Sequence, residues 1–256
     1  MSLLVADGIT KRFAGITAVD DVRVALDAGE RVGLIGPNGA GKTTLFNCLL
    51  GLLRPDAGSV SFDGQDITRL PVYRRARLGI GRTFQRVELF SGSSVRDHLL
   101  FAHRIRSGTG ALWKDVLGLG LPKPAEMERC DALLESLGLG GMGDEPIEAL
   151  SLGQSRLVEV ARALMTQPRV VLLDEPSSGL DRDETNALAD TLARIQAEQG
   201  FGLLLVEHDV ELVASFTERT YVLDFGKLIT HGSTPDVMRN DQVRAAYLGD
   251  FVAGTQ

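Results

Sequence analysis

The sequence has few cysteines, no long hydrophobic run and no excess of positive charge. Cys48 and Cys130 are its only two cysteines and lie 82 positions apart, which argues against a disulfide framework or a cysteine metal site. The longest stretch without a charged residue is the 11-residue segment 43–53, whereas a membrane-spanning helix needs about 20 apolar residues. With 27 basic and 34 acidic residues the net charge is −7, which argues against a general nucleic-acid-binding protein.

The remaining composition is that of an ordinary globular protein. Of the 256 residues, 44% are hydrophobic and 24% are charged, enough for a substantial core in one large domain or two small ones. The first residues reach Asp7 without a basic region or an apolar segment, so we expect no secretory signal. A cytoplasmic location is the resulting expectation.

Three short, continuously apolar runs predict strands that are covered on both faces, as in parallel sheets. The first follows Arg31 within residues 31–35, and the other two occupy residues 170–173 and 203–206. Between the last two runs, Leu188, Leu192 and Ile195 recur at helical spacing, and Gly200 stands where a helix C-cap is expected. The order strand, helix, strand predicts a parallel α/β sheet.

Other segments differ from this pattern. Val22, Val24 and Leu26 alternate with polar or small residues, which predicts a half-buried strand. From about residue 91 to residue 150 there is no strong strand pattern, but apolar residues recur at helical spacing over 126–137. We therefore expect a helical subdomain, residues 91–154, inserted into a core of residues 1–90 and 155–256.

The most informative segment is the glycine-rich run 36–43, a full match to the phosphate-loop pattern G-x-x-x-x-G-K-[ST] between a predicted strand and a predicted helix. Backbone N–H groups can approach a polyphosphate closely only where side chains are absent, and the helix N-terminus favours its negative charge. A simple glycine turn would not require Lys-Thr at its end. We expect nucleotide binding by Gly36, Pro37, Asn38, Gly39, Ala40, Gly41, Lys42, Thr43 and Thr44.

Acidic residues follow the predicted strand 170–173. Asp174 is placed to hold Mg²⁺ together with the Thr43 hydroxyl, and Glu175 is placed to act as the general base that orients the attacking water. The next apolar strand ends in Glu207-His208, at the edge where open α/β sheets bind ligands. His208 is therefore a candidate contact of the γ-phosphate.

Taken in order, these parts resemble the nucleotide-binding domain of ATP-binding cassette (ABC) transporters over essentially the whole chain. The family's signature sequence is matched by residues 150–154, Leu-Ser-Leu-Gly-Gln. Its Q-loop, D-loop and switch histidine correspond to Gln85, Asp181 and His208. The resemblance implies an α/β fold of the P-loop NTPase (RecA-like) type: a parallel-sheet core with an antiparallel β subdomain and an inserted α-helical subdomain.

The resemblance also implies a mechanism. Two such domains face each other with two ATP molecules between them, and each ATP is contacted by the signature residues of the opposite subunit: Ser151, Leu152, Gly153 and Gln154. Gln85 takes part in hydrolysis, binds Mg²⁺ and links the γ-phosphate to the membrane partner, while Asp181 works across the dimer. Phe13 is expected to stack on adenine and Val19 to pack against the nucleotide.

Leu152 departs from the general family pattern, which has glycine at this position. Similar ATPases of branched-chain amino-acid importers tolerate a large residue there. With Lys42, Asp174, Glu175 and His208 all present, the hypothesis is an active ATPase. A non-hydrolytic regulatory subunit, for which Leu152 is the only argument, is the alternative.

Segments 79–85, 206–209 and 244–250 together resemble the larger ATPase of branched-chain amino-acid importers. Lipopolysaccharide-export ATPases share the Tyr-Leu-Gly ending, and a non-transport ABC ATPase is a further alternative. The resemblance implies ATP and Mg²⁺ as ligands and transmembrane permeases as partners, together with a second, usually non-identical ATPase and, indirectly, a solute-binding protein. It also implies a peripheral location at the cytoplasmic face of the membrane, with no nucleic-acid partner.

Overall fold

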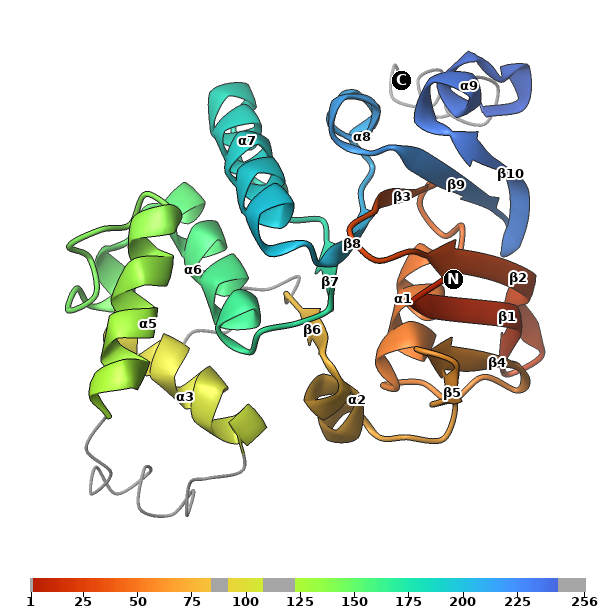
Figure 1. The fold of residues 1–256 in the computed structure, drawn as a ribbon. Helices are drawn as coiled ribbons and strands as arrows, with labels where there is room; N and C mark the ends of the chain where they lie inside the picture. Colours follow the sequence, from red (N-terminus) through yellow and green to blue (C-terminus); the bar gives the residue numbers. More distant parts are fainter. Residues whose placement is uncertain (1, 84–91, 108–122, 244–256) are drawn as a thin grey trace.

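The computed structural model describes residues 2–83, 92–107 and 123–243, which form two β-sheets and the helices around them (Figure 1). The larger sheet has six strands in the order β10-β9-β3-β8-β7-β6, and all except β10 run parallel. Its strands are β3 (Arg31–Ile35), β6 (Ile80–Arg82), β7 (Val170–Asp174), β8 (Gly202–Val206), β9 (Arg219–Asp224) and β10 (Lys227–Ser233). The predicted parallel α/β sheet is confirmed.

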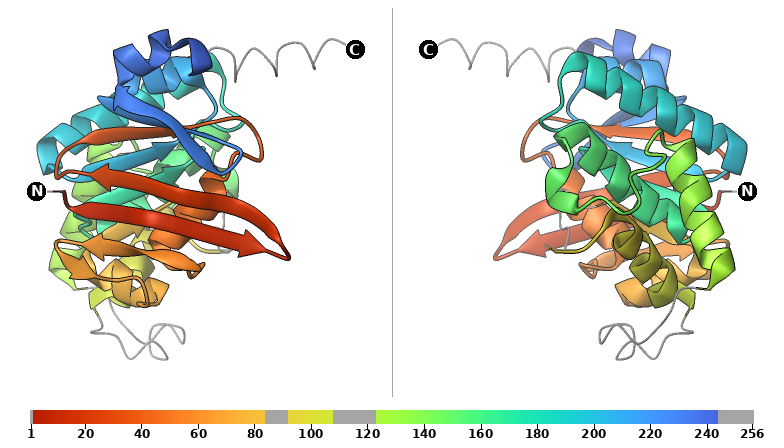
Figure 2. Two further views of the ribbon diagram at one scale, coloured as in Figure 1. Left: turned by 90° about the vertical axis from the view of Figure 1, so that its right-hand side faces the viewer. Right: turned by 90° about the vertical axis from the view of Figure 1, so that its left-hand side faces the viewer.

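A smaller, antiparallel sheet covers one side of this core, with strand order β2-β1-β4-β5. Its strands are β1 (Leu4–Phe13), β2 (Ile16–Leu26), β4 (Ala57–Phe62) and β5 (Gln65–Asp66). Val22, Val24 and Leu26 are buried and Arg23 between them is exposed, as the alternation predicts. Figure 2 shows the long strands β1 and β2 side by side at this face of the molecule.

The parallel strands separate two hydrophobic cores. In β7, Val170 and Leu172 pack into the core shared with the small sheet, whereas Val171 and Leu173 pack into the core shared with the helices on the other face. All four side chains are buried to 1% exposure or less. Each such side chain contributes about 1.5–3 kcal/mol when fully buried, which explains why both faces of the strand are apolar.

Helix α1 (Lys42–Leu50) fills the space between the two sheets and begins at the glycine-rich loop. It ends at Gly51, whose φ of 80° closes the last turn. Arg75 of α2 (Val72–Leu78) lies across this end and is only 1% exposed. Its guanidinium donates to the carbonyls of Cys48 and Leu49 at 2.8 and 2.6 Å, and also to those of Thr68 and Leu70. A buried cation at a helix C-terminus is favourable because the carbonyls there carry partial negative charge.

The helical group inserted between β6 and β7 lies on the opposite side of the molecule from the small sheet (Figure 1). It consists of α3 (Val95–Ser107), α5 (Pro124–Ser136), the 3₁₀ turn Ile147–Ala149 and α6 (Leu152–Met165). Cys130, Leu134 and Leu137 are buried, so the apolar face predicted over 126–137 is confirmed. None of the helices in the described ranges is long and apolar enough to cross a membrane.

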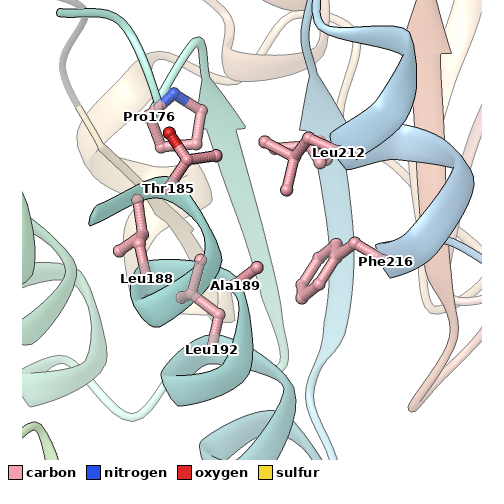
Figure 3. Close-up of a pocket in the computed structure, with 8 residues that line it drawn as sticks. Pro176, Thr185, Leu188, Ala189, Leu192, Leu212 and Phe216 are labelled. Carbon is pink, nitrogen blue, oxygen red and sulfur yellow. The ribbon is translucent and has the colours of Figure 1, made fainter. Parts of the chain in front are cut away.

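Helices α7 (Arg182–Gln199), α8 (Val210–Phe216) and α9 (Thr234–Arg239) complete the fold. Leu188, Leu192 and Ile195 are buried on α7, and Gly200 is its C-cap with φ 71°, as predicted. Where α7 faces α8, a narrow pocket remains whose lining is almost entirely apolar (Figure 3). It offers no charged group to a ligand, so we assign it to packing.

Candidate nucleotide site

The glycine-rich loop joins the end of β3 to the start of α1, at the carboxyl edge of the parallel sheet. Gly36 and Gly41 have φ values of 155° and 100°, which L side chains rarely adopt. A Cβ on Gly36 would lie 2.2 Å from the Leu223 carbonyl oxygen, and one on Gly41 would lie 2.4 Å from the Ala18 carbonyl oxygen. Glycine is therefore required at both positions by backbone conformation and by space.

Lys42 and the two threonines after it begin helix α1. The Lys42 ammonium is buried with the residue at 6% exposure, and it donates to the carbonyl oxygens of Gly36 at 2.6 Å and Pro37 at 3.1 Å. Thr43 is exposed and Thr44 is half-buried on the first turn. The loop therefore places one cation and one exposed hydroxyl beside the N-terminal end of a helix, an arrangement suited to a polyphosphate.

The carboxyl ends of β7 and β8 bring three carboxylates and one histidine together. Asp174 ends β7 at 6% exposure, and its Oδ1 is buried without a hydrogen-bond partner in the described part of the chain. Burial raises the pKa of Asp174 to about 6, and the negative charges of Glu175 and Glu207 add to this shift while Lys42 opposes it. Burial of the charged Asp174 carboxylate therefore costs free energy, which a bound cation would offset.

Glu175 has an unusual backbone conformation. Its φ is 47°, uncommon for a residue with a side chain, and its N–H donates to the Val206 carbonyl at 2.8 Å. Its Oε1 lies 4.0 Å from His208 Nδ1, and the His208 side chain is 59% exposed. The structure thus brings the predicted base and the predicted switch histidine to one place, as required for both to act on the same phosphate. Strained residues are typical of such sites.

Glu207 is a site residue whose role the sequence did not reveal. It is fully buried, and its Oε1 accepts from the Ser177 N–H at 3.0 Å and from the Ser177 hydroxyl at 2.6 Å. Its Oε2 accepts from the His208 N–H at 3.2 Å and lies 3.6 Å from His208 Nδ1. Glu207 thereby links the backbone that follows Glu175 to the backbone of His208. Its position directly before His208 was the only signal in the sequence.

The donors near Asp174 fit a magnesium ion. Mg²⁺ prefers carboxylate, hydroxyl and water oxygens, and proteins hold it through one or two such ligands together with substrate phosphates. The unpartnered Asp174 Oδ1 and the exposed Thr43 hydroxyl are ligands of this kind. Gln85, the third predicted ligand, lies outside the described residues.

Phe13, predicted to stack on adenine, and Val19, predicted to pack against the nucleotide, lie on strands β1 and β2. Phe13 ends β1, pairs with Ile16 across the hairpin and is 44% exposed. The Lys11 ammonium stands 5.5 Å from the centre of its ring. Val19 is fully buried, and its Cγ2 would lie 3.4 Å from a Cβ on Gly41, so it packs directly beneath the glycine-rich loop. Phe13 is therefore open to a ligand, whereas Val19 supports the loop from within the core.

The signature segment, residues 150–154, begins helix α6. Ser151 is the N-cap: its Oγ accepts from the Gln154 N–H at 3.2 Å, and Gln154 Oε1 accepts from the Ser151 N–H at 2.9 Å. Leu152 is 42% exposed. Gly153 adjoins Glu184 of α7, whose Oε1 would lie 3.3 Å from a Cβ at position 153. The segment thus presents a helix N-terminus at the surface.

The D-loop, residues 178–181, lies beside the signature segment. Asp181 caps α7 by accepting from the Glu184 N–H at 2.8 Å, and Glu184 Oε2 accepts from the Asp181 N–H at 3.1 Å. A Cβ on Gly179 would lie 3.0 Å from Leu152 Cδ2. Among the described residues, the predicted site residues other than Phe13 therefore form two groups: the glycine-rich loop with the ends of β7 and β8, and the signature segment with the D-loop.

The chain is similar to known proteins over most of its length. A family model described as "ABC transporter" matches residues 19–178. The chain is 38% identical over 251 residues to the high-affinity branched-chain amino acid transport ATP-binding protein LivG of Salmonella typhimurium, covering 97% of this chain and 98% of that protein. It is 36% identical over 250 residues to the lipopolysaccharide export system ATP-binding protein LptB of Haemophilus influenzae, covering 98% of each. A crystal structure of the ADP conformation of an ABC-transporter ATP-binding cassette superposes with a TM-score of 0.87 at 31% identity, covering 97% of this chain and 99% of that one.

Proposed function

Because the chain belongs to the ABC transporter family, we propose that it powers an importer of branched-chain amino acids or related small solutes. It is an ABC transporter ATPase, which binds ATP with Mg²⁺ and hydrolyses ATP to drive transport in concert with transmembrane permease subunits. The observation that carries the substrate class is 38% identity to LivG over 97% of the chain. Lipopolysaccharide export, the process in which LptB takes part, is the second candidate because that relative is 36% identical over a similar length.

The glycine-rich loop supplies the binding of ATP in this proposal. Backbone N–H groups of residues 38–43 and the N-terminus of α1 bind the phosphates, and Lys42 places its charge on the β- and γ-phosphates. Phe13 stacks on the adenine ring, while Val19 holds the loop against the small sheet. Pro37, Asn38, Gly39, Ala40 and Thr44 complete the lining.

Hydrolysis is assigned to the end of the parallel sheet. Thr43, Asp174 and Gln85 would hold Mg²⁺, which neutralises charge on the phosphates when bound. Glu175 accepts the proton of the attacking water, and His208, which stands 4.0 Å from it, contacts the γ-phosphate. Glu207 keeps both in place through its bonds to Ser177 and to the His208 N–H.

The second group of site residues would act on a neighbouring subunit. Ser151, Leu152, Gly153 and Gln154 present a helix N-terminus, which is suited to the γ-phosphate of an ATP bound by another ATPase subunit. Asp181 lies beside them and works across the same interface. We therefore propose a pair of ATPase subunits, usually non-identical, attached to permeases at the cytoplasmic face of the membrane and supplied by a solute-binding protein.

The test is transport by the assembled complex. The tagged protein is co-purified with its permeases from detergent-solubilised membranes and placed in proteoliposomes with the solute-binding protein, MgATP and radiolabelled leucine. We expect ATP-dependent leucine uptake, which Glu175→Gln abolishes while ATP binding persists. Glu198→Gln on the exposed face of α7 is the matched control and should retain uptake.

Three outcomes would contradict parts of the proposal. Co-purification with lipopolysaccharide-export partners would replace the importer by the second candidate. Full ATPase activity in the Glu175→Gln complex would show that another group is the base. Failure to recover any membrane partner would refute the assignment to transport.

A further inference from the structure

We propose that Arg156 is a positioning residue that fixes Glu175 by tying the signature segment to the D-loop. The inference rests on the proposed function, in which Glu175 is the base and the signature segment contacts ATP held by the neighbouring subunit. It adds a path within this chain between the two groups of site residues. Arg156 lies on α6, two residues after the signature segment, and has no role in the assignment given above.

The central contact is between Arg156 and the main chain of the D-loop. Arg156 Nη2 donates to the Ser178 carbonyl oxygen at 3.1 Å. The N–H of the same Ser178 donates to the Glu175 carbonyl oxygen at 3.1 Å. Ser178 is thus held on one side by the signature helix and on the other by the residue that carries the base. Two hydrogen bonds connect α6 to the backbone of Glu175.

The environment of Arg156 makes this contact rigid. The residue is 7% exposed, and its Nη1 donates at 3.3 Å to Oε2 of Glu159, which is 1% exposed. A planar guanidinium can bond a carboxylate and a carbonyl at once in fixed directions, which the single ammonium of lysine does less well. A buried ion pair is poor evidence of added stability, and its best-attested use is to specify one arrangement.

Two further close approaches connect the signature segment with the D-loop and with the first turn of α7. Leu152 lies against Gly179 of the D-loop, and Gly153 lies against Glu184, the residue that completes the cap formed by Asp181. The Leu152 side chain therefore lies over Gly179 of the D-loop. Displacement of the signature segment would therefore also displace the D-loop, because the segments are close together at more than one point.

Glu175, to which these hydrogen bonds lead, has a conformation that depends on its surroundings. Glu175 holds a φ of 47°, which persists only when the surrounding structure enforces it. Ser177, two residues after Glu175, is held by hydrogen bonds to the buried Glu207. The Arg156 link therefore completes the restraint on the turn that carries Glu175. When ATP bound by the neighbouring subunit contacts the signature segment of this chain, the contact would affect the position of Glu175 in the same chain.

The experiment compares Arg156→Lys with the wild type in the assembled complex, measuring ATPase rate against ATP concentration. We expect kcat to fall by about tenfold or more, because small misplacement of a catalytic group is costly. The KM for ATP should change by less than about twofold, since no ATP contact is removed. The Hill coefficient for ATP should fall toward that of independent sites. Arg194→Lys is the matched control, because Arg194 of α7 also donates to a backbone carbonyl, that of Ser136, far from the D-loop.

A second variant tests the inference if the Arg156→Lys protein does not fold. Arg156→Met combined with Glu159→Leu removes both members of this buried ion pair together and carries the same expectation. The inference is overturned if a folded variant keeps the wild-type kcat and Hill coefficient, or if Arg194→Lys lowers kcat as much. A wild-type complex without ATPase activity would instead refute the proposed function, and this inference with it.

Discussion

Replacing Asp174 by asparagine should make the protein more stable at pH 8 in the absence of nucleotide and metal. The pKa of Asp174 is raised from 3.8 to about 6 by burial and by the negative charges of Glu175 and Glu207. A shift of about 2 units corresponds to about 3 kcal/mol of unfavourable free energy in the charged folded state. Asparagine has nearly the same shape without the charge, and its amide group can donate to the neighbouring carboxylates.

The pH dependence follows from the sign of the shift. The folded protein binds the Asp174 proton more tightly than the unfolded chain does, so this group favours folding below pH 3.8 and the advantage is lost as the pH rises through about 6. The gain from Asp174→Asn should therefore be about 3 kcal/mol at pH 8, about half of that near pH 5, and close to zero at pH 3.

The assay is urea denaturation of wild type and variant in EDTA at pH 8 and pH 5, repeated with MgATP at pH 8. Mg²⁺ with ATP should stabilise the wild type and should do so much less for Asp174→Asn, because the cation loses its carboxylate. Asp190→Asn on the exposed side of α7 is the control and should change the unfolding free energy by less than about 0.5 kcal/mol. A gain equal at both pH values, or no gain at pH 8, would refute the reasoning.

Three further predictions follow from the contacts around the site. Arg75→Met should lower the free energy of unfolding in urea by roughly 3 kcal/mol or more, because four backbone carbonyls lose a charged donor; an unchanged midpoint would contradict this. Gly41→Ala should abolish binding of a fluorescent ATP analogue, because its Cβ would lie 2.4 Å from the Ala18 carbonyl oxygen; normal affinity would show that the loop can shift. Glu207→Ala should lower kcat by about tenfold or more with a smaller effect on KM, because the Ser177 N–H and hydroxyl lose their acceptor; a wild-type rate would exclude a positioning role for Glu207.

The parts of the site that could be predicted from the sequence are those whose chemistry is local. The glycine-rich loop is contiguous, and each residue type in it answers one physical need: close backbone approach, a cation or a hydroxyl. Asp174 and His208 could be placed because each follows an apolar strand, and parallel strands end at one edge of the sheet. The strands themselves could be predicted because both of their faces are buried.

The contacts that could not be predicted join residues distant in the chain. Arg75 stands among Arg74 and Arg77 in what reads as a charged surface helix, and only packing shows that this one of the three is buried. The bonds from Glu207 to Ser177 and from Arg156 to Ser178 span 30 and 22 positions. Periodicity reports which face of an element is apolar, but it does not report which polar side chain crosses to another element.

The closeness of Leu152 to Gly179 bears on how each of the two positions can change during evolution. With leucine at 152, a side chain at 179 would begin 3.0 Å from Leu152 Cδ2, in a backbone conformation with φ 85°. A change to a smaller residue at 152 faces no such obstacle. The limit at 179 comes mainly from the backbone, because a φ of 85° favours glycine there whatever residue stands at 152, whereas the exposed end of the Leu152 side chain can turn away. Position 152 can therefore change in size without a matching change at 179, while position 179 is held to glycine by its own backbone conformation.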